Sequence, residues 1–248
     1  MTDLPKTAYK TGEVCPVCGE EIWAVKVCGC IELKKPCRCK NEEAEEYEKT
    51  LEERKKRQAY EARLSWADIP GQFANSALRE FKKRKGTEAA FQTVKNWVLN
   101  MEENLKTGKG LILSGPTGCG KTHLAVAAAR ACIQNGHTAV FWSVADNLER
   151  MMPGHGEEWE YAVLMEKANR AQVLILDDLG VEKTSEWTQK QLTVIIDRRY
   201  REKKPIIATT NCKADEMREH LGDRAFSRLI GMTSTEILTA CDYRRNYD

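Results

Sequence analysis

The stretch from Gly115 to Thr122 matches the pattern G-x-x-x-x-G-K-[ST] of a phosphate-binding loop. Glycines in such a loop let successive backbone amides turn toward phosphate oxygens, and the following helix directs the positive end of its dipole at the same oxygens. We expect Lys121 to reach the β- and γ-phosphates of a nucleotide and the Thr122 hydroxyl to bind Mg²⁺. The residues assigned to nucleotide binding are Gly115, Pro116, Thr117, Gly118, Cys119, Gly120, Lys121 and Thr122.

A second acidic element follows the apolar segment 173–176, which ends in Asp177 and Asp178. This arrangement is typical of a Walker B strand, in which the acids stand at the carboxyl end of a buried strand. Asp177 would hold Mg²⁺ through water, and Asp178 would orient or deprotonate the water that attacks the γ-phosphate. The two motifs together predict a site that binds and hydrolyses a nucleoside triphosphate.

The amino-terminal part of the chain is rich in cysteine. Thiols stay reduced in a cytosolic compartment, so this density indicates a metal site rather than disulfides. An amino-terminal module of about 40 residues cannot build a core of its own, and bound zinc would supply its folding free energy. Six of the ten cysteines lie within the first 39 residues, namely Cys15, Cys18, Cys28, Cys30, Cys37 and Cys39.

The first pair of zinc ligands is given by Cys15 and Cys18, because C-P-V-C-G is typical of a zinc knuckle. For the second pair we favour Cys37 and Cys39, which directly precede a charged segment and leave enough chain for a hairpin around Trp23. Two alternatives stay open, a site completed by the pair Cys28–Cys30 and a two-metal cluster that uses all six thiolates. We expect this module to dock a protein partner, with nucleic-acid binding as the alternative.

The segments between these motifs predict how the chain is organised. Residues 41–65 contain no Pro or Gly and carry Glu-to-Lys or Glu-to-Arg pairs four residues apart, which predicts a solvated helix. Pro70 and Gly71 end that pattern shortly after Trp66. We therefore expect a zinc-binding module over residues 1–40, a charged helical linker over 41–65 and an ATPase domain over 66–248.

The expected ATPase domain alternates between apolar segments and helical patterns. An amphipathic helix is predicted from Phe91 to Leu105, and later helices are predicted to start near Lys121, Ala145, Glu186 and Asp215. Five strands joined by crossover helices imply a mainly parallel sheet in an α/β domain. The strands are expected at residues 110–114, 138–143, 172–177, 205–210 and 235–238.

Composition excludes several classes of protein. With 42% hydrophobic residues the chain can form a large core, and 31% charged residues give it a well-solvated surface, so wholesale disorder is not expected. The net charge of +2 gives no global signal for a polyanionic partner. The apolar stretches are far shorter than the roughly 20 residues of a membrane span, and the amino terminus has no signal-peptide core. We expect a cytoplasmic protein that does not interact with a membrane.

Three further motifs carry a resemblance to a known family. The segment Ile206–Asn211 resembles the sensor 1 strand of AAA+ ATPases, Gly222–Leu229 resembles their arginine-bearing box VII, and Asp242–Arg244 resembles sensor 2. Together with the Asp-Asp-Leu-Gly segment, these motifs are similar to those of replicative helicase loaders of the DnaC/DnaI type, including phage versions. The resemblance covers about residues 66–248.

That resemblance implies an AAA+ core with a five-stranded sheet, ATP-dependent assembly into a homo-oligomer, and placement of a hexameric replicative helicase on single-stranded DNA. It also implies that Asn211 contacts the γ-phosphate or the lytic water, that Arg228 completes a neighbour's site in trans, and that Arg244 acts as the sensor 2 arginine. Arg224 lies four residues from Arg228 and stays the alternative for the trans role. Most AAA+ members carry Glu where this chain has Asp178, so we expect slow, switch-like hydrolysis.

Two other functions remain open. A transposition helper ATPase of the IstB kind would share the core motifs, although it lacks a Cys-paired amino-terminal module. A zinc-dependent adaptor would use ATP only as a conformational clamp.

Overall fold

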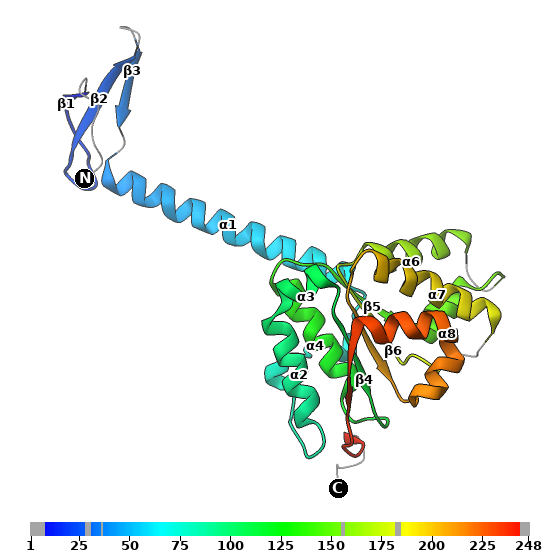
Figure 1. Cartoon of the computed structure of the whole chain (residues 1–248). Helices are drawn as coiled ribbons and strands as arrows, with labels where there is room; N and C mark the ends of the chain where they lie inside the picture. Colours follow the sequence, from blue (N-terminus) through cyan, green and yellow to red (C-terminus); the bar gives the residue numbers. More distant parts are fainter. Residues whose placement is uncertain (1–7, 28–30, 36, 155–156, 182–184, 244–248) are drawn as a thin grey trace. The chain divides into compact units, whose positions relative to one another are not determined.

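The computed structural model describes residues 8–27, 31–35, 37–154, 157–181 and 185–243 (Figure 1). The chain divides into two compact units, Met1–Ala59 and Tyr60–Asp248, which are described separately below. Cys28, Cys30 and Arg244, all named in the sequence analysis, lie outside the described residues. Within the described ranges, none of the helices is both long and apolar enough to cross a membrane.

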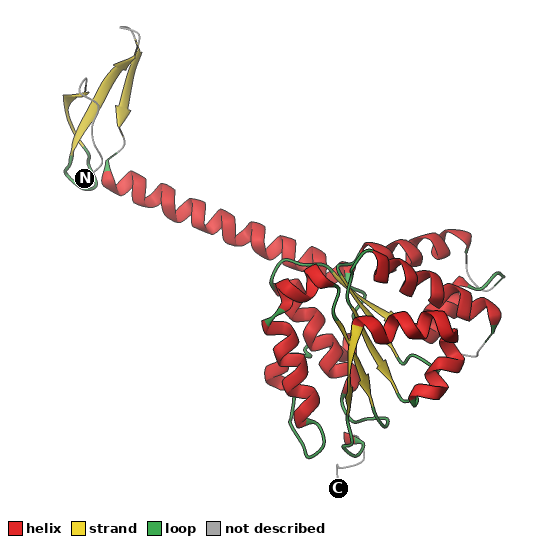
Figure 2. Ribbon diagram, in the orientation of Figure 1, coloured by secondary structure: helices red, strands yellow, loops and turns green. Residues whose placement is uncertain are grey.

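The first unit contains a small antiparallel sheet (Figure 2). Its strands β1 (Ala8–Val14), β2 (Glu21–Val27) and β3 (Ile31–Lys35) lie in the order β1-β2-β3. Gly19 closes the turn between β1 and β2 with φ of 72°, a left-handed conformation that glycine adopts without steric cost. The charged segment forms helix α1 (Arg38–Trp66), whose residues up to Ala59 belong to this unit.

The second unit is built on a five-stranded parallel sheet with the order β5-β6-β7-β4-β8. Its strands start within two residues of the positions expected from the sequence, and the predicted α/β fold class is confirmed. Their bounds are β4 (Gly110–Ser114), β5 (Ala139–Ser143), β6 (Val173–Asp177), β7 (Ile206–Thr210) and β8 (Thr233–Ile237).

Helices cover both faces of this sheet (Figures 1 and 2). Alternate strand residues point to opposite faces, so Leu174 and Leu176 enter one apolar cluster while Val173 and Ile175 enter the other. The cluster that contains Ile175 packs beneath α2 (Glu88–Leu99), α3 (Met101–Thr107) and α4 (Lys121–Gln134). The opposite cluster packs beneath α5 (Val144–Met151), α6 (Glu158–Arg170), α7 (Glu186–Arg201) and α8 (Ala214–Met232).

Two helices differ from the expected pattern. The single helix expected from Phe91 to Leu105 is split into α2 and α3 at Asn100, whose side-chain amide donates to the carbonyl of Asn96. Helix α8 bends at Gly222, where φ is 76° and ψ is 158°. Residues with a Cβ rarely adopt that backbone conformation, so glycine is favoured at this position. The bend gives the second half of α8 its own direction along α7.

A fully buried arginine ties elements together at the edge of the sheet where strands β6 and β7 begin. Arg199 is 0% exposed and donates to the backbone carbonyls of Ala168, Ala171, Gln172 and Pro205 at 2.7 to 3.0 Å. Burial lowers the pKa of its guanidinium to about 9, which still leaves it charged at neutral pH. This group fixes the end of α6 and the start of β7 relative to α7.

Candidate nucleotide-binding site

The phosphate-binding loop connects β4 to the amino terminus of α4, in the strand-loop-helix order that the motif requires. Gly118 and Gly120, like Gly115, have positive φ and leave no room for a side chain. A Cβ at Gly118 would overlap the carboxylate of Asp242, and a Cβ at Gly120 would lie 2.8 Å from the Phe81 ring. These two glycines are therefore required by the packing of the loop as well as by its backbone conformation.

Lys121 joins this loop to the neighbouring strand end. Its side chain is buried, and its ammonium donates to the carbonyls of Gly115 and Pro116 at 2.9 Å and to the Asn211 amide oxygen at 2.7 Å. Strand β7, which Asn211 follows, pairs directly with β4, so the carboxyl ends of the two strands meet. The structure thus brings together the phosphate-loop lysine and the residue identified by resemblance to sensor 1.

The two Walker B acids have different environments. Asp177 ends β6, is 8% exposed and accepts a hydrogen bond from the Thr209 hydroxyl at 2.7 Å. Burial raises the pKa of Asp177, and the bond from Thr209 opposes that effect. Asp178 is exposed and has φ of 55°, with its backbone amide held by the same Thr209 hydroxyl at 2.9 Å.

The residues present fit a magnesium ion. The Thr122 side chain lowers the pKa of Asp177 and lines the same cavity, so the hydroxyl and the carboxylate that were expected to share Mg²⁺ lie near each other. A buried carboxylate with a raised pKa gains its charged form when a divalent cation lies beside it. Thr122 and Asp177 would hold the ion, and its charge would be shared with phosphate oxygens.

A cavity of about 520 Å³ lies over the loop and the ends of β6 and β7. Eight of the residues assigned from the sequence line it, namely Thr117, Gly118, Gly120, Lys121, Thr122, Asp177, Asp178 and Asn211. Concave sites of roughly 300 to 1,000 Å³ suit small ligands and cofactors. The cavity therefore has room for a nucleotide whose phosphates lie against the loop.

One wall of this cavity consists of residues that no sequence motif predicts. The wall comes from residues 72–84, with the short 3-10 turns Gly71–Phe73 and Leu78–Glu80, and from Tyr243. The Phe81 ring stacks on Phe91 with 5.8 Å between ring centroids, and the Arg84 guanidinium lies 5.0 Å from the Tyr243 ring. Phe81 and Tyr243 follow no helical or strand periodicity, so the sequence gives no pattern that places them at this cavity.

The box VII arginines lie on the second half of α8. Arg224 donates to the Asp197 carboxylate at 2.8 Å, and Arg228 forms an ion pair with the other oxygen of the same carboxylate. Neither arginine is among the residues that line the cavity of its own chain. Their role in a neighbour's site stays a prediction, and so does the sensor 2 role of Arg244, which is outside the described residues.

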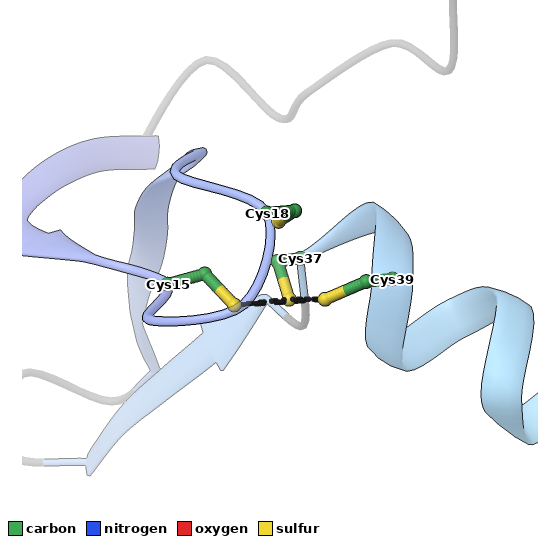
Figure 3. Close-up of side chains that lie close together, drawn as sticks. All are labelled: Cys15, Cys18, Cys37 and Cys39. Carbon is green, nitrogen blue, oxygen red and sulfur yellow. Dashed lines mark hydrogen bonds between the residues drawn. The ribbon is translucent and has the colours of Figure 1, made fainter.

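The first unit gathers four cysteines (Figure 3). Cys15 and Cys18 come from the turn after β1, whereas Cys37 directly precedes α1 and Cys39 lies in its first turn. All four sulfurs lie within 4.8 Å of one another. The Cys37 sulfur is 3.3 Å from that of Cys15 and 3.0 Å from that of Cys39. Zinc–sulfur bonds of about 2.3 Å in a tetrahedron separate sulfurs by about 3.8 Å, so small shifts would fit zinc.

Backbone amides make one of these thiols a good metal ligand. The amides of Cys18 and Val17 hydrogen-bond to the Cys15 sulfur and lower the pKa of that thiol to about 6. A thiolate is the form that binds zinc, so the knuckle turn prepares its first ligand for the metal. The cluster consists of the four cysteines favoured from the sequence, and zinc itself stays a prediction.

The chain is similar to a family of ATP-binding proteins and to several known proteins. The family model described as IstB-like ATP binding protein matches residues 45–231. A replicative helicase loader DnaC from Escherichia coli is 28% identical over 150 residues, which are 58% of this chain and 58% of that protein. An ATP-binding protein of insertion sequence IS21 from Pseudomonas aeruginosa is 30% identical over 126 residues, 51% of this chain and 47% of its relative.

A solved structure extends these similarities. The crystal structure of the DnaC helicase loader matches with a TM-score of 0.59 and 28% identity, and the match covers 68% of this chain and 99% of that chain. This likeness confirms both the resemblance to DnaC-type loaders and the AAA+ fold class. The chain nevertheless spans less than two thirds of the length of the curated relatives described above.

Proposed function

The chain belongs to the family of IstB-like ATP-binding proteins, and from that membership we propose that it loads a hexameric replicative DNA helicase onto single-stranded DNA in an ATP-dependent manner. The observation that carries this proposal is the likeness to the DnaC loader, which extends over 99% of the solved loader chain. The cavity beside Lys121 and Asp177 supports the proposal, because it has room for a nucleotide with its phosphates against the loop. Helicase loading takes place on chromosomal DNA, so we also propose a cytoplasmic location.

In the proposed reaction this chain binds ATP and hydrolyses it slowly. Lys121 neutralises charge on the β- and γ-phosphates, and Asn211 holds the lysine in place and reaches the γ-phosphate side of the cavity. Magnesium held by Thr122 and Asp177 would neutralise the phosphate charge that develops. Asp178 orients the attacking water, and as the shorter acid it lies farther from that water than Glu would. Slow turnover suits a protein that uses each hydrolysed ATP to switch once between two states.

We assign the trans-acting arginine to Arg228, with Arg224 as the alternative. A Lys121→Ala chain keeps its arginines but lacks a competent pocket, whereas an Arg228→Ala chain keeps its pocket. Each variant alone is expected to be nearly inactive, because trans arginines in other NTPases contribute about 10³ to 10⁵ in rate. Mixing the two should restore ATPase activity in a way that depends on protein concentration. A mixture that stays inactive although oligomers of native size form would exclude Arg228 and call for the same test with Arg224→Ala.

We propose that the first unit docks a protein partner through its zinc-bound form. An adaptor that uses ATP only as a conformational clamp is the alternative for the whole chain. Steady-state ATPase assays with and without single-stranded DNA separate the two, because a loader should respond to the DNA and a pure clamp should not.

The second candidate function is that of a transposition helper. It is favoured by the 30% identity to the IS21 ATP-binding protein. Capture experiments decide between the candidates: the immobilised chain with ATP should retain a replicative helicase and not a transposase. Retention of the transposase alone would establish the helper function and exclude the loader.

A further inference from the structure

A single carboxylate on α7 holds both box VII arginines. Asp197 Oδ2 accepts from Arg224 at 2.8 Å, and Asp197 Oδ1 pairs with Arg228. The Asp197 side chain is only 12% exposed, whereas the Arg224 side chain is 70% exposed and that of Arg228 is 26% exposed. The acid is thus covered by the two guanidinium groups, which present the accessible part of the cluster.

One further side chain contacts Arg228, and the bend of α8 sets the direction of the helical half that carries both arginines. The Arg228 guanidinium lies 5.8 Å from the centroid of the Tyr200 ring, on the turn of α7 that follows Asp197. The bend at Gly222 starts the helical half that carries both arginines, and their spacing of four residues places them on one face. Arg218 spans the bend through a 2.5 Å contact with Asp223.

We infer that Asp197 is a positioning residue that holds Arg228, together with Arg224, in the orientation needed to reach the nucleotide of a second copy of this chain. The inference rests on the proposed function, because it requires a trans-acting arginine. It adds a residue on α7 that the arginine motif does not contain and that touches no nucleotide in its own chain: Asp197 is not among the residues that line the cavity.

Hydrogen-bond capacity favours a positioning role over a latch that blocks the arginine. A guanidinium has five N–H donors, and a carboxylate oxygen engages only part of them, so each arginine keeps donors for a phosphate. Two arginines and one aspartate also leave a net positive charge at this surface. A phosphate can therefore bind the arginine while Asp197 still holds it, and the conformational entropy of a long side chain is lost before assembly rather than during it.

The test uses Asp197→Asn in the full chain. The amide is isosteric with the carboxylate, but its nitrogen donates and cannot accept, so one arginine loses its partner. A misplaced catalytic contact of about 1 Å lowers rates by about a hundredfold. We expect kcat for ATP to fall by about ten- to a hundredfold while ATP affinity, zinc content and oligomer size stay unchanged.

A matched control removes a different acid from the same helix region. Glu202 follows the last residue of α7 and pairs with Arg198 and Lys204, without contact to either box VII arginine. Glu202→Gln should leave kcat within a factor of two of the unaltered chain, about the scatter expected when a surface pair is lost. An equal fall in kcat in both variants would mean that negative charge near the end of α7, rather than the contact with the arginines, sets the rate of ATP hydrolysis. That result would overturn the inference.

Mixing experiments then identify which part of the site is damaged. An Asp197→Asn chain keeps its pocket, so it should regain activity when it is mixed with Lys121→Ala, whose arginines are intact. It should not regain activity with Arg228→Ala, because both chains then lack a competent arginine. Failure of the Asp197→Asn and Lys121→Ala mixture would contradict the inference, provided that Arg228→Ala and Lys121→Ala complement each other. If that reference pair also fails although oligomers form, the proposed trans arginine is wrong, and the inference falls with it.

Discussion

Replacing Lys121 by Ala should abolish tight nucleotide binding without unfolding either unit. The Lys121 ammonium has three donors, and the structure gives each an acceptor: the carbonyls of Gly115 and Pro116 at 2.9 Å and the Asn211 oxygen at 2.7 Å. We expect at least two of these donors to move to β- and γ-phosphate oxygens when ATP enters the cavity. The neighbouring carbonyls can then accept from water or from the loop.

The magnitude follows from those two contacts. A hydrogen bond between charged groups contributes about 1.5 to 3 kcal/mol, so two of them contribute about 3 to 6 kcal/mol of ATP binding. At about 1.4 kcal/mol for each factor of ten, Kd should rise by about 10² to 10⁴. Loss of the ammonium from apo protein costs less, because the three acceptors lie close to the open cavity and can be hydrated.

Titration with a fluorescent ATP analogue measures this change directly, and Lys109→Ala serves as a matched control. Lys109 is an exposed lysine immediately before β4, at the end of the strand opposite to the loop. The control should bind ATP as the unaltered chain does, and both variants should keep their zinc content. Unchanged ATP affinity in Lys121→Ala would refute the assignment of this loop as the phosphate site.

Three further outcomes follow from single features. Chelation of zinc, or Cys15→Ser, should unfold the first unit and leave the thermal transition of the second unit in place. Metal analysis should find one zinc per chain, and loss of metal from a Cys28→Ser variant with retention in Cys37→Ser would reverse our choice of ligands. Asp178→Asn should lower hydrolysis by about 10² or more with ATP binding intact, because Asn tolerates the left-handed backbone at φ of 55°; rapid-quench assays check the rate, and wild-type turnover would remove Asp178 from the mechanism. Arg199→Met should cost about 3 kcal/mol or more by leaving four buried carbonyls without their donor, and calorimetry should show Tm lowered by about 6 to 12 °C; an unchanged Tm would mean that water replaces the guanidinium.

Local sequence patterns predicted the central sheet well. The phosphate loop, the apolar strand before Asp177 and the strand before Asn211 each combine a run of apolar residues with a polar end, and such a pattern depends on residues that are adjacent in the chain. Parallel strands then bring their carboxyl ends to one edge of the sheet. The meeting of Lys121, Asp177 and Asn211 at the cavity follows from that geometry.

Features that depend on contacts between distant segments were not predictable in the same way. The cavity wall around Phe81 and Tyr243 joins segments about 160 residues apart, and neither segment has a periodic pattern. The pairing of Asp197 with the box VII arginines depends on how α7 packs on α8 after the bend at Gly222. The strands of the first unit are short and carry mixed polar and apolar residues, so the cysteine spacing was the stronger signal there.

The most direct test of the proposed loader function measures deposition of a replicative helicase on single-stranded DNA. Immobilised single-stranded DNA coated with single-strand binding protein is incubated with helicase, ATP and either this chain or its Lys121→Ala variant, and the retained helicase is quantified after a salt wash. The proposal predicts that helicase is retained only with the unaltered chain and ATP. Equal retention without the chain, or with Lys121→Ala, would contradict it.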